Sequence, residues 1–382
     1  MKTLKNISKS KENMLVTKSE NINKFSVPYD TLHKGFTLIT GTNNDIKLDS
    51  FKNMLVDSCR KKSTLFIDTK GMLDSNSICL LSSHYLMEGK MRKYDVYEDG
   101  IPVNVFHVEP NKSNEEKAND LFDVCSSIYR KQDPNHMELL QEGMAVYVEN
   151  PEDFTDCSAF EKARIERMQI FEFLSQALAC TINDPFLHEL HYSIEHDLGD
   201  CAVMLDSWEN IIQYPGPAYY ININSGWRDS AFPIADMLLA SLRNYRKRNH
   251  DIPLDLYVND FSDLNFSSTG SIGKIIEESE RLNINVIGVS RDYYSPATPV
   301  GQIMATAEKQ YFLFPTFASK DHIKTALQIG SSEDWPFKDM LYGNAILKEI
   351  TTDPHTGKNV ASVSKGRLKN YFSLRNYFGY ND

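Results

Sequence analysis

Residues 36–55, FTLITGTNNDIKLDSFKNML, constrain the fold more than any other stretch, because an apolar run passes through a small polar turn into helical spacing. This order is typical of a phosphate-binding loop, G-x-x-x-x-G-K-[ST], in which glycines let backbone N–H groups point at phosphate oxygens. Gly41 and Lys47 stand at the spacing that the motif requires. The pattern therefore predicts an α/β fold that opens with a loop of this shape.

Two positions of the loop depart from the motif. Ile46 replaces the second glycine, and its β-branched side chain resists the backbone conformations and close ligand approach that glycine permits. Leu48 replaces the hydroxyl residue that would hold Mg²⁺. Lys47 therefore has two interpretations of equal weight: it binds phosphate weakly, or it is a solvated residue at the start of a helix.

The bulk properties favour a cytoplasmic globular protein. With 382 residues, the chain is long enough for one large α/β domain or for a core domain with an insertion. Its net charge of −11 argues against a surface that coats nucleic acid, so any such contact has to be focal. Six cysteines without C-x-x-C spacing indicate free thiols in a reducing compartment. The N-terminus lacks the apolar core of a secretory signal, and no later run is long enough to span a bilayer.

The hydrophobic pattern divides the chain into five parts. Residues 1–24 contain too few apolar side chains to bury and are expected to form a flexible tail. Residues 25–112 and 206–368 alternate strand and helix patterns with short connections, which favours a mainly parallel sheet flanked by helices and ending in a β-hairpin. Residues 113–205 have helical periodicity and predict an inserted helical subdomain. The aromatic segment 369–382 is expected to dock on its own domain, another subunit or a partner.

Polar residues follow two of the predicted strands. Asp68 and Lys70 come after the run TLFI, and Asn259 and Asp260 come after the run LDLYV. Because open α/β sheets bind ligands at the carboxyl ends of their strands, these residues are candidates for a site.

Taken together, residues 36–368 resemble the core of the FtsK/HerA superfamily of ring-forming P-loop ATPases, which includes the coupling proteins of type IV secretion. In that family the loop strand is followed by a strand ending in an Asp-x-Lys-Gly-like element, which here is Asp68-Thr69-Lys70-Gly71. In the family, a helical insertion, an acidic strand, an arginine and a polar sensor strand then follow. The segment from Ser279 through NINVIGVSRD is similar to the family's arginine and sensor strand. The resemblance implies a RecA-like P-loop core and an oligomer of related or other assembly subunits, and it makes ATP, Mg²⁺ and DNA candidate ligands.

The resemblance also gives the candidate site residues and shows where this chain differs. The family's metal-side Asp is Asn259, which carries no charge to offset Mg²⁺, and its Glu is the shorter Asp260. At the sensor strand, Ser290-Arg291 replaces a common Gln. The candidate catalytic residues are Asp260, Asn259, Arg281 and Arg291; the candidate cofactor-binding residues are Gly41, Thr42, Lys47, Asp68 and Lys70; no metal ligand is assigned.

Two further clusters have a structural and a functional interpretation. Arg243, Arg246, Lys247 and Arg248 end a predicted helix, where cations complement the helix dipole. Contact with a nucleic-acid backbone or a neighbouring subunit is the less favoured interpretation. The histidines of HELHYSIEH, in residues 188–196, fit a polar helix face better than a zinc site.

These observations predict a catalytically impaired FtsK/HerA-like homologue with weak or absent ATPase activity. It would act as a structural or regulatory subunit of a DNA-processing assembly in a mobile element, a conjugation apparatus or an anti-phage system. One alternative is an active but atypical ATP-driven DNA translocase that uses Lys47 and Asp260. A second is a protein-interaction module that binds no nucleotide.

Overall fold

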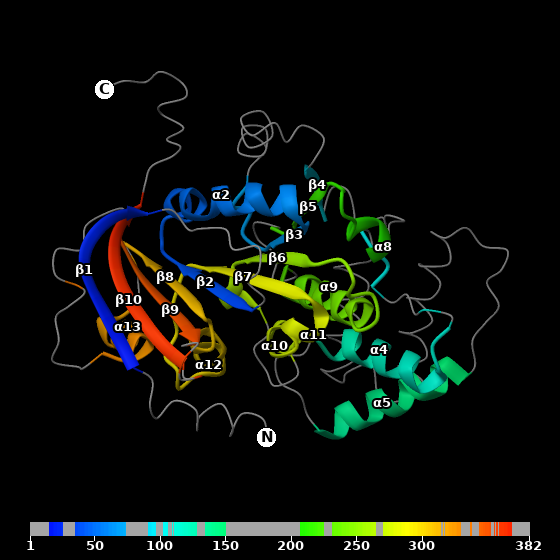
Figure 1. Cartoon of the computed structure of the whole chain (residues 1–382). Helices are drawn as coiled ribbons and strands as arrows, with labels where there is room; N and C mark the ends of the chain where they lie inside the picture. The colour runs from blue at the N-terminus through cyan, green and yellow to red at the C-terminus, as the bar shows by residue number, and fades with distance from the viewer. Residues whose placement is uncertain are drawn as a thin grey trace. The chain divides into compact units, whose positions relative to one another are not determined.

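The chain divides into two compact units. Their helices and strands are labelled in Figure 1. The first comprises Met1–Asp30, Gly35–Asp57 and Ile287–Asp382, and the second comprises Thr31–Lys34 and Ser58–Val286. The structure, a computed structural model, describes residues 15–25, 35–73, 91–96, 102–105, 109, 111–127, 134–149, 207–224, 231–264, 270–314, 316, 318–329, 337, 344–352, 355, 357 and 359–368.

The first unit contains both parallel and antiparallel strands. Its strands follow the order β1-β10-β9-β8-β2. β1 pairs in parallel with β10, and β2 with β8, whereas β9 is antiparallel to both of its neighbours. The bounds are β1 (Leu15–Phe25), β2 (Phe36–Thr40), β8 (Lys309–Leu313), β9 (Asn344–Thr352), β10 (Asn359–Leu368), α12 (Pro299–Ala305) and α13 (Lys320–Leu327). The helix α2 (Asn44–Lys61) begins in this unit, and the strand β7 (Ile284–Ser290) ends in it.

The second unit is built on parallel strands in the order β6-β3-β5-β4. These strands are β3 (Ser63–Asp68), β4 (Met91–Asp95), β5 (Ala218–Asn222) and β6 (Leu254–Asn259). The helices are α4 (Asn114–Ser127), α5 (Pro134–Glu149), α8 (Trp208–Ile211), α9 (Ala231–Arg246), α10 (Ser271–Glu277) and α11 (Ser279–Leu282), with a 3-10 turn at Phe261–Asp263.

Apolar side chains explain why these segments form buried strands and helices. Every residue of β3, β6 and β7 is buried, as expected for parallel strands covered on both faces. On α9, Ile234, Leu238 and Leu242 repeat every four residues and are fully buried, so one face of the helix packs on the core. The predicted α/β fold with a mostly parallel sheet is confirmed.

The two ends of the chain compare differently with the sequence-based predictions. The predicted hairpin is confirmed, because β9 and β10 pair in antiparallel register from Asn344↔Arg367 to Thr352↔Asn359. The tail expected over residues 1–24 differs from the structure, in which Leu15–Phe25 forms β1. A polar segment can form a strand here because pairing with an edge uses backbone N–H and C=O groups rather than apolar side chains.

In the predicted insertion, α4 and α5 match the first two helical patterns. The third pattern and the histidines of residues 188–196 lie outside the described residues, as does the aromatic segment 369–382. The boundaries between the five parts remain predictions. None of the helices in the described part of the chain combines the length and hydropathy needed to cross a membrane.

Candidate functional site

The structure distributes the candidate residues over both units. Gly41, Thr42, Lys47 and Arg291 belong to the first unit. Asp68, Lys70, Asn259, Asp260 and Arg281 belong to the second, together with Arg243, Arg246, Lys247 and Arg248.

The phosphate-loop segment forms a short turn that is closed by its own hydrogen bonds. Only Gly41, Thr42 and Asn43 lie between β2 and α2. The side chain of Asn43 accepts a hydrogen bond from the backbone N–H of Ile46 at 3.0 Å, which is the geometry of a helix N-cap. The carbonyl of Asn43 accepts from the N–H of Lys47 at 3.0 Å, which is the first helical hydrogen bond of α2.

This early helix start changes what the turn can bind. In an intact phosphate loop, backbone N–H groups before and at the lysine point at phosphate oxygens. Here the N–H groups of Ile46 and Lys47 already donate hydrogen bonds to the side chain and to the carbonyl of Asn43, respectively. Ile46 is also buried at 8% exposure, and Lys47 at 2%. The turn therefore does not fit a phosphate group unless the first turn of α2 unwinds.

Packing alone explains why residue 41 is glycine, and no bound ligand is needed to account for it. A Cβ atom at this position would lie 2.9 Å from the Cβ of Leu313 on β8, closer than real Cβ atoms approach. The N–H of Gly41 also donates to the carbonyl of Ser290 at 3.0 Å. The first glycine of the motif thus serves the packing of the first unit.

In the second unit, the carboxylate of Asp68 is the centre of a buried hydrogen-bond network. One oxygen, Oδ1, accepts from the N–H of Lys70 at 2.9 Å and from Nδ2 of Asn259 at 2.8 Å. The other, Oδ2, accepts from the N–H of Met72 at 2.6 Å and from the hydroxyl of Tyr220 at 2.7 Å. Asp68 is fully buried. Its carboxylate therefore organises the turn after β3, in which Gly71 adopts a positive φ of 65°.

Asn259 completes this network from the neighbouring strand. It is the register partner of Asp68 and is 1% exposed. Its Nδ2 donates to Asp68, whereas its Oδ1 is buried without a hydrogen-bond donor. An amide at this position can donate to the buried carboxylate, which a second carboxylate could not do when ionised. The neighbour Asp68 thus provides a physical reason for Asn in place of the Asp of the family pattern.

Asp260 and Arg281 both contact nearby residues of the chain. Oδ1 of Asp260 accepts from the N–H of Ser262 at 3.1 Å and from its hydroxyl at 2.7 Å, so the carboxylate caps the 3-10 turn. Arg281 is 62% exposed and forms an ion pair with Glu278 at 2.7 Å. Arg291 is exposed and directly follows β7.

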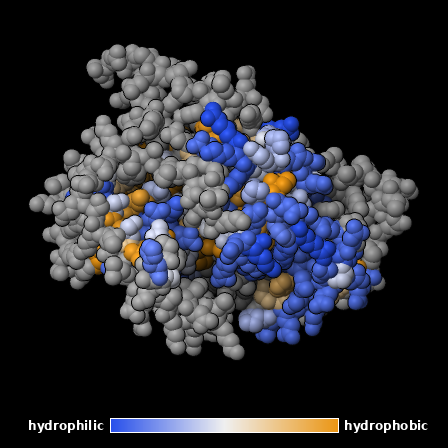
Figure 2. Space-filling model, viewed as in Figure 1, coloured by the Kyte–Doolittle hydropathy of each residue, from blue (hydrophilic) through white to orange (hydrophobic). Residues whose placement is uncertain are grey.

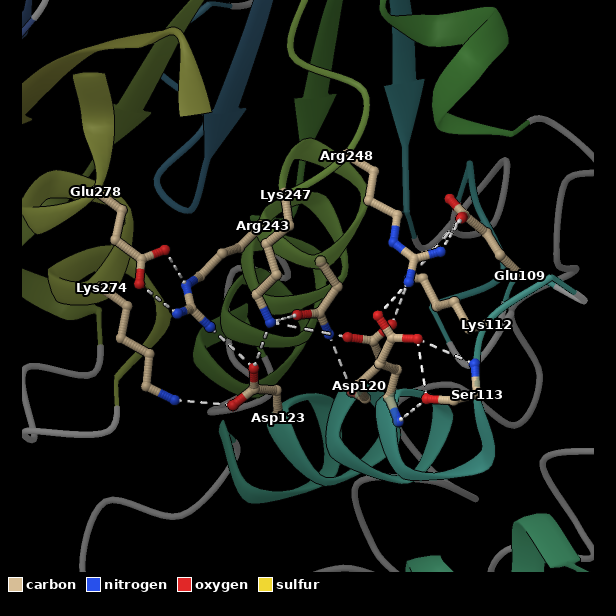
Figure 3. Close-up of polar contacts among 12 residues, drawn as sticks. Glu109, Lys112, Ser113, Asp120, Asp123, Arg243, Lys247, Arg248, Lys274 and Glu278 are labelled. Atoms are coloured by element: carbon tan, nitrogen blue, oxygen red, sulfur yellow. Dashed lines mark hydrogen bonds and ion pairs between the residues drawn. The ribbon is translucent and has the colours of Figure 1, made fainter. Parts of the chain in front are cut away.

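The basic cluster at the end of α9 faces acidic residues of α4 and α10–α11 (Figure 3). Arg243 contacts Asp123 at 2.9 Å and Glu278 at 2.6 Å. Lys247 contacts Asp123 at 3.3 Å, and Arg248 pairs with Glu116, lowering the pKa of that carboxyl to about 2. Hydrophilic residues gather over this part of the viewed face (Figure 2). These cations therefore stabilise the docking of α4 on α9.

Arg246 has a different environment from the rest of the cluster. It is fully buried, and its guanidinium donates to the carbonyls of Leu282, Asn283, Asn249 and His250 at 2.7 to 3.4 Å. Leu282 ends α11 and Asn283 is its C-cap, whereas Asn249 and His250 belong to the segment that follows α9. Arg246 therefore holds the segment after α9 against the C-terminal end of α11. Its guanidinium is not available to a nucleic-acid backbone.

We expect Asp123→Asn to lower the free energy of unfolding by about 1–3 kcal/mol, because Arg243, Lys247 and Lys274 would lose a shared carboxylate. Burial opposes ionisation of Asp123, but these cations outweigh it and hold its pKa below the ordinary 3.8. A depressed folded pKa means that this stabilisation is present above the unfolded pKa and is lost as pH falls through the folded one. Urea unfolding of both proteins between pH 2.5 and pH 7 measures the difference.

Glu115→Gln is the matched control, because Glu115 is an exposed acid on the same helix. It removes one negative charge and is expected to change stability by less than about 0.5 kcal/mol. Equal effects of the two substitutions would show that only net charge matters. The difference is also expected to shrink in 1 M salt, where charges are screened.

Sequence reasoning missed several partners in these networks. Asn43 carried a detectable signal, since Asn before a helix that opens with Asn44 and Asp45 is a preferred N-cap. Tyr220 could have been placed on the same face of β5 as Asn222, because side chains two residues apart along a strand point to the same face. Within the described ranges, no group of three or more His, Cys, Asp or Glu side chains is arranged to hold a metal ion.

Comparison with solved structures defines the fold class. The chain has the RecA-like P-loop fold, which confirms the fold predicted from the sequence. VirB4 of Thermoanaerobacter pseudethanolicus matches with a TM-score of 0.59 and 10% identity, covering 94% of this chain and 98% of that protein. The plasmid coupling protein TrwB in complex with the ATP analogue ADPNP matches with a TM-score of 0.56 and 10% identity, covering 93% and 91%.

A further TrwB structure, in complex with ADP and Mg²⁺, matches with a TM-score of 0.54 and 10% identity over 93% of this chain and 91% of that one. The likeness to these solved structures confirms the resemblance drawn from the motifs at the level of the fold. No protein-family profile matches the chain, and a search of curated protein sequences finds no match.

Proposed function

We propose that this protein is a catalytically impaired FtsK/HerA-like subunit with a structural or regulatory role in a DNA-processing assembly. The observation that carries the proposal is the set of hydrogen bonds in the turn after β2, where Asn43 accepts one hydrogen bond from the N–H of Ile46 and one from the N–H of Lys47. A nucleotide phosphate would have to compete with these hydrogen bonds. Ile46, which is buried, also stands in place of the second glycine of the motif.

The energetics of phosphoryl transfer support impairment. This reaction depends almost wholly on positioning and on charge stabilisation by the loop, the lysine and Mg²⁺. The chain has Leu48 in place of the Mg²⁺-binding hydroxyl and Asn259 in place of the metal-side carboxylate. Asp68 does not replace that carboxylate, because each of its oxygens already accepts two hydrogen bonds. Several contributions to catalysis are thus missing together.

The biological setting of the proposal comes from the structural neighbours. VirB4 and the plasmid coupling protein TrwB share the fold over nearly the whole chain, and TrwB is described as a bacterial conjugative coupling protein. We therefore place this protein in a conjugation-related or similar DNA-processing assembly in the cytoplasm, beside related ATPase or other subunits. A local contact with DNA is compatible with a net charge of −11 only if it is focal.

The competing function is an active, atypical translocase, and retention of Lys47 and Asp260 favours it. We expect the purified protein to show no ATP turnover above that of Lys47→Ala, because the phosphate-binding donors are engaged. Turnover that this substitution abolishes would overturn the proposal. The assay is phosphate release with Mg²⁺, with and without double-stranded DNA.

Thermal unfolding with 1 mM Mg·ATP separates impaired catalysis from absent binding. A site with a Kd of about 10 μM would add about 2.7 kcal/mol of stability at this concentration. We expect a shift of less than about 1 °C, and the same result for Lys47→Ala. A large shift that Lys47→Ala removes would show that the turn opens for nucleotide.

A further inference from the structure

The helix α4 of the second unit carries its acidic and its apolar side chains on different sides. Because an α-helix turns by about 100° per residue, Glu116, Asp120 and Asp123 fall on one side, which we call the acidic stripe. Leu121 and Cys125 fall on roughly the opposite side, and both are buried. The helix packs against both α5 and α9 (Figure 1). Its two sides therefore have different neighbours.

The acidic stripe is the side of α4 that meets α9. Four cations of α9, its C-terminal end and α10 lie opposite this stripe, namely Arg243, Lys247, Arg248 and Lys274 (Figure 3). Asp123 contacts Arg243 and Lys274 at 2.9 Å each and Lys247 at 3.3 Å. Glu116 pairs with Arg248 at the other end of the stripe. The carbonyl of Asp120 also accepts from Nδ2 of Asn244 at 3.0 Å.

The apolar side of α4 is turned away from these cations, and α5 provides apolar side chains to match it. Leu140, Met144 and Val148 recur every four residues along α5 and are buried. We infer that apolar packing joins α4 to α5, whereas ion pairs contribute strongly to joining α4 to α9. Ions and competing charges weaken ion pairs but not apolar contacts. Separation from α9 as one helical pair therefore preserves the packing of α4 on α5.

The four cations suit a phosphodiester backbone. A guanidinium binds carboxylates and phosphates with the same bidentate geometry, and a lysine binds phosphate as a point charge. Arg243 already has this geometry toward Glu278, because its Nε and Nη2 lie 3.0 Å and 2.6 Å from the two carboxylate oxygens. The side chains of Lys247, Lys274 and Arg248 are 29%, 24% and 38% exposed. These three cations thus lie at a margin of the contact that solvent reaches.

We propose that α4 is an autoinhibitory cover, whose acidic stripe occupies cations that bind a nucleic-acid backbone when α4 and α5 lift from α9. Phosphates then replace carboxylates, so the exchange leaves no partly buried cation without a partner. The apparent affinity for nucleic acid equals the intrinsic affinity reduced by the fraction of chains that are open. The inference rests on the DNA-processing part of the proposed function, and it does not depend on nucleotide binding.

Removing charge from the acidic stripe tests the cover. Asp120→Asn combined with Asp123→Asn keeps the volume of both side chains and weakens their ion pairs, and we call this chain the released chain. We expect it to bind a fluorescein-labelled DNA duplex of random sequence about tenfold more tightly than the original chain, because a larger fraction is open. Fluorescence anisotropy between about 50 and 200 mM salt measures the affinity. The salt slope is expected to steepen by about 2–4, as for up to four added phosphate contacts.

Glu116→Gln is a milder variant that removes only the partner of Arg248. Glutamine preserves the capping box, in which residue 116 accepts from the N–H of Ser113 and Ser113 accepts from the N–H of residue 116, so α4 is expected to stay folded. We expect the salt slope for this variant to steepen by about one. Its folded state is checked by circular dichroism.

Glu115→Gln combined with Glu138→Gln is the matched control. Both glutamates are exposed, one on α4 and one on α5, and neither belongs to the acidic stripe. The control removes the same two negative charges as the released chain, and it is expected to change the affinity by less than about twofold. Equal tightening by the control and the released chain would show that only net charge matters, and the proposal would then be wrong.

Lys274→Gln shows which surface the duplex contacts. In the released chain this substitution is expected to reduce the salt slope by about one, whereas in the original chain it is expected to leave the weak binding unchanged. Hydrogen exchange of the original chain gives an independent readout. Saturating duplex is expected to speed amide exchange in residues 114–127 and to leave exchange in residues 231–246 slow.

Several outcomes would overturn the proposal. The released chain and the original chain might be found to bind the duplex equally, or neither chain to bind it. Binding of duplex without faster exchange in residues 114–127 would place the contact elsewhere in the chain. Binding of polyglutamate in place of the duplex would indicate an acidic protein segment as the partner. None of these measurements involves ATP turnover, so the cover and the catalytic impairment are tested separately.

Discussion

Replacing Asp68 with Ala is expected to lower the free energy of unfolding by about 3–5 kcal/mol. The carboxylate is fully buried and accepts from four donors: the N–H groups of Lys70 and Met72, Tyr220 and Asn259. Ala removes the acceptor and leaves these donors buried without a partner. The variant no longer buries the negative charge of Asp68, and the desolvation cost that it avoids offsets part of the loss. The expected loss is therefore smaller than the sum over four hydrogen bonds.

Urea unfolding of the variant measures this effect, and Tyr220→Phe provides the graded comparison. Phe keeps the ring of Tyr220 and removes only the hydroxyl that donates to Oδ2 of Asp68 at 2.7 Å. A loss of about 1–3 kcal/mol is expected. If Asp68→Ala instead cost less than about 1 kcal/mol, the carboxylate would not be the centre of the network, and its role as a ligand would regain support.

The fold could be predicted largely from hydrophobic pattern. The runs that became β3, β6 and β7 are apolar and short, and the spacing of α9 leaves one apolar face, so a buried parallel sheet with helices was the consistent solution. The pattern could not predict β1, because pairing at an edge uses the backbone and leaves little signal in the side chains. The apolar pattern of the sequence thus predicted the strands of the core better than the strand at the edge of the sheet.

The candidate site was predictable in position but not in chemistry. The carboxyl ends of parallel neighbours meet at one edge, so Asp68 and Asn259 could be expected together. Motif spacing did not reveal that α2 begins at Asn44, since the capping role of Asn43 competes with the loop pattern. The partners of Arg243 lie on α4 and at Glu278, far away in sequence, so only the fold could show that this cation is paired.

The substitution Asn259→Asp tests why this chain has an amide at the metal-side position. The new carboxylate would stand where Nδ2 of Asn259 now lies 2.8 Å from Oδ1 of Asp68, with both side chains almost fully buried. Two like charges at this separation repel by several kcal/mol at an effective dielectric constant of about 20, so the new carboxyl tends to take up a proton. We expect a loss of about 3–4 kcal/mol at pH 7, measured by urea unfolding.

The pH dependence of this loss identifies its cause. Repulsion and burial raise the folded pKa of the new carboxyl above its unfolded value of about 3.9, so the folded state binds more protons than the unfolded state between these values. Stability of the variant relative to the original chain is therefore expected to fall as pH rises above about 4, and the two proteins are expected to converge below it. A loss that is independent of pH would indicate poor packing instead of repulsion.

Asn222→Asp is the matched control, because it makes the same change in the same row of strand ends. Nδ2 of Asn222 donates to Asp95 at 2.7 Å, but Asp95 is 16% exposed, so water screens the new pair. A smaller loss of about 1 kcal/mol is expected. Mg²⁺ at 10 mM is expected to leave the Asn259→Asp loss unchanged, because the oxygens of Asp68 are occupied by donors. Recovery in Mg²⁺ would mean that one substitution restores a metal site, and impairment would then rest on the turn after β2 alone.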